Sequence, residues 1–150
     1  MNGITIEKNK DITGFTTFGI PVKARYFAEY SSEKELLKIS RTDEFIGNEV
    51  LHIGGGSNLL FCDDFDGLVL HSRIKGITRY DKDNDTVYAI AGAGEKWTDF
   101  VAWCLENGLE GVENLSGIPG EVGRQSFLLL PFYRSVTFAL LQSSLQKCHL

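Results

Sequence analysis

The sequence predicts an α+β fold, and three observations support this prediction. Short apolar runs bounded by turn residues, which are typical of strands, recur between residues 24 and 91. One longer stretch near residue 100 repeats its apolar residues with helical spacing. The connections between these segments are too irregular for a regular alternation of strand and helix. We therefore expect helices packed on a mostly antiparallel or mixed sheet.

The first predicted strand covers residues 24–30, where apolar and polar residues partly alternate. A short helix should follow, because Ser32 and Glu35 form an S-x-x-E capping box just before an apolar run. Three further strands are expected over residues 50–53, 68–71 and 86–91, with a polar hairpin loop at 81–85.

The strongest helix prediction covers residues 95–107. Its apolar residues recur at steps of three, four, seven and eight and would form one buried stripe: Trp97, Phe100, Val101, Cys104 and Leu105. Gly108 supplies the end of the helix. The aromatic residues of this stripe are expected in the core rather than on a stacking surface.

Composition narrows the function classes. The 150 residues fit one ordinary domain, and 43% hydrophobic with 23% charged residues excludes a disordered or low-complexity chain. The net charge of -5 argues against nucleic acid as a partner. The three cysteines lack a C-x-x-C pair, and the first residues lack the apolar stretch of a secretory signal. We expect a cytoplasmic protein without disulfides, metal site or membrane association.

The chain changes character after Gly123. All 20 Asp and Glu and all 16 Gly lie in residues 1–123, whereas residues 124–150 contain none of them and three Lys or Arg. Pro131 interrupts this second stretch, and its apolar residues show no clean helical period. Residues 124–150 are therefore read as an atypical, basic and apolar tail.

A first glycine-rich segment follows the predicted strand at 50–53. Three consecutive glycines let the backbone approach a ligand, so that successive amides can converge on an anion such as a diphosphate. The alternative is a tight structural turn. A Walker A loop and a Rossmann fingerprint both fail letter by letter. The candidate residues are Gly54, Gly55, Gly56, Ser57, Asn58 and Leu59.

A second glycine-rich segment places glycines at three-residue intervals around a rigid proline. It could continue the same cradle or line a planar ring, and the alternative is a simple loop between helix and strand. The candidate residues are Ser116, Gly117, Ile118, Pro119, Gly120 and Gly123. A third small-residue segment at 91–97 is interpreted as tight packing between strand and helix.

The remaining polar residues give no catalytic or metal signature. His52, His71 and His149 lack metal-ligand spacing, and no pair of carboxylates has a recognisable catalytic arrangement. Arg73 and Lys75 could face a phosphate, although solvated charges on a strand are the commoner case.

Five motifs in order resemble the UDP-N-acetylenolpyruvoylglucosamine reductase family of flavoenzymes: FTTFGIPVKA, LHIGGGSNLLF, SRIKGI, AGAGEKWTDFV and GVENLSGIPGEVG. The resemblance covers about residues 13–123. It implies the FAD-binding fold of the vanillyl-alcohol oxidase or PCMH type, which is not a Rossmann fold. The twelve residues of the two glycine-rich segments given above would then hold FAD, with the first segment at its diphosphate.

The resemblance also implies a reaction. In this family NADPH reduces FAD, and the flavin passes hydride to the enolpyruvyl group of a UDP-sugar to make a peptidoglycan precursor, UDP-N-acetylmuramate. A serine, a glutamate and an arginine assist. They belong to segments that this sequence does not match, so no catalytic residue is assigned here.

The sequence departs from the family at residue 124. Family members continue with a segment like S-P-x-Q-N-x-G-A-Y-G, whereas this chain reads RQSFLLLPFYRS. We expect residues 1–123 to be the N-terminal part of an FAD-binding domain, residues 124–150 to be out of frame, and the substrate domain to be absent. The 150 residues alone should then be inactive. The alternatives are a stand-alone nucleotide-binding or interaction module, or another FAD-dependent oxidase of the same superfamily.

Overall fold

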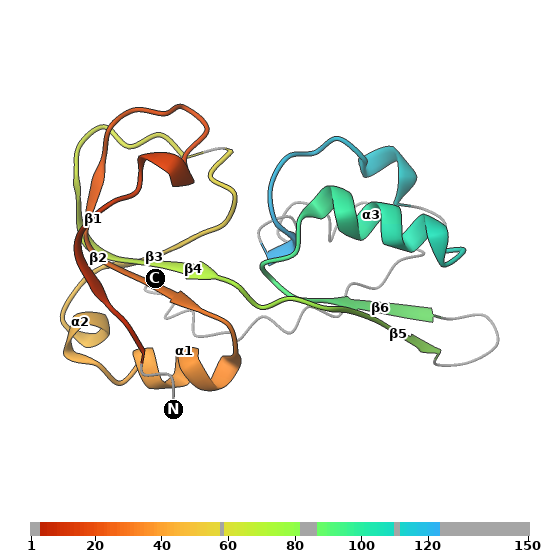
Figure 1. Cartoon of the computed structure of the whole chain (residues 1–150), viewed down its shortest axis with the longest axis horizontal. Coiled ribbons are helices and arrows are strands. Elements are labelled where there is room, and N and C mark those ends of the chain that lie inside the picture. Colours follow the sequence, from red (N-terminus) through yellow and green to blue (C-terminus); the bar gives the residue numbers. More distant parts are fainter. Residues whose placement is uncertain (1–3, 58, 82–86, 110–111, 124–150) are drawn as a thin grey trace, which may run out of the picture.

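The computed structural model describes residues 4–57, 59–81, 87–109 and 112–123. These residues form two packed groups joined by the segment after β4 (Figure 1). The first group holds a four-stranded sheet with two short helices, and the second holds a two-stranded hairpin covered by one longer helix. The predicted tail, residues 124–150, lies outside the described residues.

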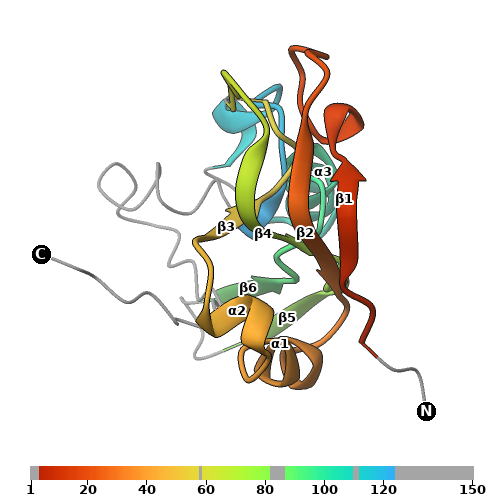
Figure 2. The ribbon, with the colours of Figure 1, turned by 90° about the vertical axis from the view of Figure 1, so that its left-hand side faces the viewer.

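The larger sheet is mixed, as predicted. Its strands are β1 (Glu7–Asp11), β2 (Lys23–Tyr30), β3 (Val50–Ile53) and β4 (Phe65–Ser72). They lie in the order β1-β2-β4-β3, which Figure 2 shows side by side. β1 is antiparallel to β2, whereas β4 runs parallel to both of its neighbours.

The central strand β4 is buried on both faces. Val69 packs with Phe27 and Ile12 on one face, and Leu68 and Leu70 pack on the other face against residues of helix α1 (Glu33–Ile39). Leu68, Val69 and Leu70 have no solvent exposure. This double burial explains why the strand reads as a continuous apolar run in the sequence.

The predicted capping box forms at the start of α1. The Ser32 hydroxyl accepts a hydrogen bond from the Glu35 amide at 3.3 Å. The Glu35 carboxylate returns to the Ser31 amide at 2.6 Å, one residue before the usual position. A second short helix, α2 (Asp43–Ile46), follows and was not predicted.

The second group is built on the antiparallel hairpin of β5 (Ile77–Asp81) and β6 (Val87–Ala91). Helix α3 (Trp97–Glu106) lies along this hairpin (Figure 1). Its buried residues are those of the predicted stripe, except that Leu105 is exposed: Trp97, Phe100, Val101 and Cys104. Of the predicted hairpin loop at 81–85, the structure describes only the first residue, which ends β5.

The segment between β4 and β5 packs against the small-residue segment 91–97. The Gly92 amide donates to the Gly76 carbonyl at 2.8 Å, and the Gly94 amide donates to the Ile74 carbonyl at 3.0 Å. A Cβ on Gly92 would collide with the Ile74 carbonyl, and a Cβ on Gly94 would collide with the Ser72 carbonyl at the end of β4. The structure therefore agrees with the architectural interpretation of residues 91–97. Among the described helices, none has the length and apolar character needed to cross a membrane.

Candidate functional site

The first glycine loop, residues 54–59, leaves the carboxyl end of β3, beside the end of the parallel strand β4. Asn58 lies outside the described residues. Gly56 has a φ of 65°, and a Cβ there would overlap the Phe15 carbonyl oxygen. The Thr17 amide also donates to the Gly56 carbonyl at 3.3 Å. The loop backbone is thus packed directly against the segment that follows β1, which only glycine permits at this position.

The second glycine loop, residues 116–123, is tied to the start of α3 by backbone hydrogen bonds. The Trp97 amide donates to the Gly120 carbonyl at 2.9 Å, and the Val122 amide donates to the Glu95 carbonyl at 2.8 Å. The Gly123 amide donates to the Ala93 carbonyl at 2.9 Å. The C-terminal half of this loop, from Gly120 to Gly123, is therefore fixed. Gly117 and Gly120 both have positive φ.

The two loops touch, although more than 50 residues separate them. A Cβ on Gly55 would lie 3.2 Å from the Gly120 Cα. The Ser57 hydroxyl donates to the Pro119 carbonyl at 3.3 Å. The structure thus brings together the two segments that the sequence analysis singled out.

Several backbone amides in these loops have no protein partner among the described residues. They belong to two short runs: Gly54, Gly55, Gly56 and Ser57 in the first loop, and Gly117, Ile118, Gly120 and Glu121 in the second. Unpaired amides on adjoining glycine-rich turns are available as hydrogen-bond donors for an anion. A diphosphate, with its many acceptor oxygens, fits this donor set.

Other predicted residues support the loops from behind. The Leu59 side chain packs into the cluster around Val69, and Ile118 packs against the cluster of α3. A Cβ on Gly123 would lie 2.9 Å from the Ala93 Cβ, so this glycine allows close packing. Ser116 is exposed, and its amide donates to the Glu113 carbonyl at 3.2 Å.

A buried histidine joins the sheet to the second loop, and the sequence analysis gave it no role. His71 on β4 is 4% exposed. Its Nδ1 lies 2.9 Å from a carboxylate oxygen of Glu29, and its Nε2 lies 3.2 Å from one of Glu121. Burial lowers the pKa of His71, but the hydrogen bonds to the two glutamates outweigh it, so that the pKa is raised. A histidine within a run of buried strand residues was the signal available in the sequence.

Arg73 and Lys75 have carboxylate partners. Arg73 Nε lies 3.5 Å from a Glu29 carboxylate oxygen. Lys75 lies 3.5 Å from the Glu95 carboxylate and also donates to the Gly94 carbonyl. Both side chains are more than half exposed and form ion pairs within the chain, so the structure favours the surface-charge interpretation over a phosphate contact.

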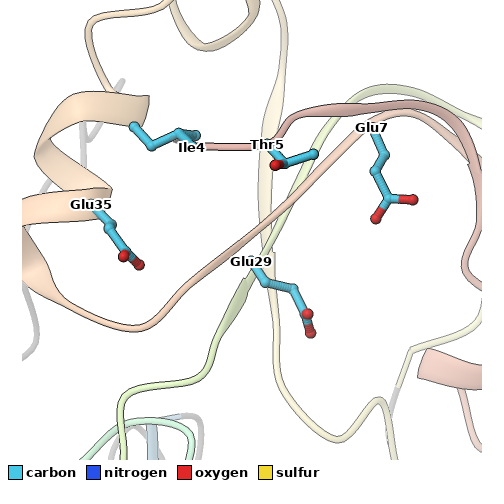
Figure 3. A pocket seen from close by; sticks show the side chains of 5 residues that line it. All are labelled: Ile4, Thr5, Glu7, Glu29 and Glu35. Carbon is cyan, nitrogen blue, oxygen red and sulfur yellow. The ribbon is translucent and has the colours of Figure 1, made fainter. Parts of the chain in front are cut away.

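A separate hollow of about 190 Å³ lies near the first residues described (Figure 3). Ile4, Thr5 and three glutamates from three different elements line it: Glu7, Glu29 and Glu35. Each of these carboxylates already accepts a hydrogen bond from the protein. The acidic lining opposes an anionic ligand, so this hollow is not a candidate for the nucleotide. In the described part of the chain, no group of three or more His, Cys, Asp or Glu is placed to hold a metal ion.

Comparisons with known proteins agree with the site. The family model of the FAD binding domain matches residues 24–123. The UDP-N-acetylenolpyruvoylglucosamine reductase of Bacteroides fragilis is 45% identical over 118 residues, which cover 79% of this chain and 35% of that protein. The enzyme of that name from Neisseria gonorrhoeae is also 45% identical, with 79% of this chain and 34% of the relative covered.

A solved structure shares the fold. The crystal structure of UDP-N-acetylenolpyruvylglucosamine reductase from Thermus caldophilus superposes with a TM-score of 0.60 at 24% identity, covering 81% of this chain and 41% of that chain. The chain spans about a third of the length of the curated relatives it matches. The expected resemblance and the expected PCMH-type α+β fold are both confirmed. The chain belongs to the FAD binding domain family, whose cofactor is FAD.

Proposed function

We propose that the two glycine loops together hold the diphosphate of FAD. The observation that carries this proposal is the contact between Gly55 and Gly120, which sets two runs of unpaired amides side by side. The residues assigned to the cofactor are those of the sequence analysis: Gly54, Gly55, Gly56, Ser57, Asn58, Leu59, Ser116, Gly117, Ile118, Pro119, Gly120 and Gly123.

Backbone donors explain how a chain of net charge -5 can take a doubly charged diphosphate. Amides carry partial positive charge and need no lysine, and the absence of a Cβ at Gly55 and Gly120 lets the phosphates approach them. Leu59 and Ile118 fix the loops from the apolar side. These residues bind and orient the cofactor, and bound FAD supplies the hydride-carrying ring.

We infer that the site serves the reductase activity that the names of the relatives state. The chain would provide the FAD-binding portion of an NADPH-dependent reductase that acts on UDP-N-acetylglucosamine enolpyruvate, in the cytoplasm. The 150 residues match only about a third of these relatives, and no catalytic residue is assigned among them, so we expect this segment to bind FAD without turnover. An NADPH-oxidation assay of the purified chain with this substrate and added FAD tests this: sustained turnover would contradict it.

The cofactor site is tested by equilibrium binding of FAD and of riboflavin, followed by flavin fluorescence. Riboflavin carries the ring but no phosphate, so it should bind much more weakly than FAD. The variant Gly55→Ala places a methyl group against the Gly120 Cα and should push the loops apart, which weakens FAD binding by roughly tenfold. Gly14→Ala is the matched control, because a Cβ at Gly14 meets nothing within 4 Å.

Two results would contradict the proposed site. One is equal binding of riboflavin and FAD, which would show that the diphosphate does not contribute to the affinity. The other is a Gly55→Ala chain that binds FAD as tightly as the Gly14→Ala chain, which would show that the spacing between the loops does not matter.

A further inference from the structure

His71 lies at the junction of three elements. It sits on β4 directly opposite Glu29 of β2 in the parallel register, and opposite Ile53 at the end of β3. Its other ring nitrogen faces Glu121 of the second glycine loop. This side chain is therefore a direct polar link between the large sheet and the loop that adjoins Gly55.

The two hydrogen bonds of His71 to ionised glutamates require that its ring is positively charged. Ionised carboxylates only accept hydrogen bonds, and a neutral imidazole has one donor nitrogen. His71 can donate to Glu29 and to Glu121 at the same time only as an imidazolium with both nitrogens protonated. In the neutral form one of these contacts, at 2.9 or 3.2 Å, must be lost.

The groups around His71 are few. Glu29 from β2, Glu121 from the second loop and Arg73 beyond the end of β4 are the charged groups, and Arg73 contacts Glu29 rather than the ring. Phe15 packs on the ring edge-on, with centroids 5.2 Å apart. Tyr30 of β2 is hydrogen-bonded to Ser72, and burial raises the pKa of its phenol. Two carboxylates thus share one imidazolium, and Glu29 has Arg73 as a second cation.

The position of Glu121 makes this link relevant to the nucleotide. Glu121 follows Gly120, its amide is one of the unpaired donors, and its side chain is 17% exposed. A carboxylate beside the proposed diphosphate would repel it unless a nearby cation offset the charge. The imidazolium of His71 is the partner of Glu121 among the described residues.

From this geometry we propose that His71, as an imidazolium between Glu29 and Glu121, is a positioning residue that turns the Glu121 carboxylate away from the diphosphate and holds the second glycine loop against the first. The inference rests on the proposed FAD site and adds to it a protonation state on which binding depends.

The sign of the pH dependence follows. Because the glutamates raise the pKa of His71 above its ordinary value of 6.5, the link is complete below that value and is lost as the pH rises through the raised pKa. FAD binding should therefore be tightest below pH 6.5 and should weaken as the pH rises above this value. The loss should be on the order of tenfold, which corresponds to one charge-assisted hydrogen bond.

Two variants of the full chain separate this role from a merely structural one. His71→Gln can donate to only one glutamate and carries no charge, so it should bind FAD roughly tenfold more weakly at low pH and show a flat pH profile. Glu121→Gln can donate its side-chain amide to a neutral His71, so it should restore tight binding at high pH. Arg25→Gln, which breaks an exposed ion pair of 3.1 Å on β2, is the control and should keep the wild-type profile.

A measurement without flavin makes the test independent of the proposed function. Hydrogen exchange of the hydrogen-bonded second-loop amides, Val122 and Gly123, should be faster in FAD-free His71→Gln than in wild type at low pH. Their exchange should rise with pH beyond the intrinsic rate only in wild type. Equal, pH-independent protection in both chains would overturn the inference, as would wild-type FAD binding that does not change with pH. A wild-type chain that binds no FAD would instead refute the proposed site, and exchange alone would then decide the role of His71.

Discussion

The two glycine loops are held by different means. The first is held by close backbone packing: Gly56 lies against the Phe15 carbonyl, and the loop continues directly from β3 of the larger sheet. The second is held by backbone hydrogen bonds with the start of α3 and by the hydrogen bond that Glu121 accepts from His71. Gly117 in the second loop has open space around it, whereas Gly56 has none.

This difference separates the framework of the site from its adjustable part. The first loop cannot move without disturbing the core of the larger sheet, so it forms the fixed side of the proposed diphosphate site. The C-terminal half of the second loop is fixed by its backbone hydrogen bonds, whereas the half around Gly117 has open space. The width of the proposed diphosphate site should therefore depend mainly on the second loop. A substitution at Gly56 should therefore cost mainly stability, whereas substitutions at the contact between the loops or in the second loop should cost mainly binding.

The largest effect is expected from Gly56→Ala. The added methyl group overlaps backbone at Phe15 and the residue must keep a φ of 65°, so unfolding free energy should fall by about 3 kcal/mol. Urea denaturation of the variant and of Gly14→Ala measures this. A stability equal to that of Gly14→Ala would show that close packing at Gly56 does not hold the first loop in place.

The next effect is expected from Trp97→Phe. The Trp97 indole is 1% exposed and donates to the Leu115 carbonyl at 2.8 Å, just before the second loop. Losing this bond leaves a buried acceptor unpaired and should cost about 2 kcal/mol of unfolding free energy. Denaturation measured by circular dichroism checks the value, and no loss would mean that α3 does not anchor the loop through this contact.

A smaller effect on stability is expected from Gly117→Ala. The residue has a φ of 87° but no atom within 4 Å of the added methyl, so the cost should be about 1 kcal/mol, from backbone strain alone. FAD affinity should fall more than stability does, because the loop would relax into another shape. If Gly117→Ala proved as destabilising as Gly56→Ala, the contrast between the two loops would be wrong.

The smallest effect at neutral pH concerns Cys104 in the core of the second group. Burial raises the pKa of its thiol from 9.0 to about 11. The unfolded thiol then ionises first, so stability falls only as the pH rises from 9.0 toward 11. Denaturation over this range should show a slope in wild type that Cys104→Ala lacks. An equal slope in both chains would assign it to another group.

Much of the fold was predictable because its signals are local. Residues 50–53 form a strand as predicted, because a short apolar run leads into a glycine turn. The helical spacing of apolar residues predicted most of the buried face of α3. Strand β1 was missed because its sequence, EKNKD, is polar throughout, and pairing with β2 rather than burial holds it in place. The first residues of the predicted helix 95–107 remain outside α3 because the backbone of Lys96 forms an isolated antiparallel β-bridge with Glu121.

The candidate site was predictable only in part, for a similar reason. Each glycine segment shows its conformational freedom in the sequence, but their contact joins residues far apart in the chain. The role of His71 depends on partners 42 and 50 residues away, and no spacing rule connects such partners. The place of His71 in a buried strand indicates that it needs polar partners, but only the three-dimensional structure identifies them as Glu29 and Glu121.

The central claim is that both loops contact the same diphosphate, and amide chemical shifts test it most directly. In a titration of the isotope-labelled chain with FAD, the amides of Gly54, Gly55, Gly56 and Ser57 should shift together with those of Gly117, Ile118 and Gly120, with one common affinity. Riboflavin at the same concentration should leave them unmoved. If FAD shifted the amides of only one loop, or riboflavin shifted both equally, the shared diphosphate site would be contradicted.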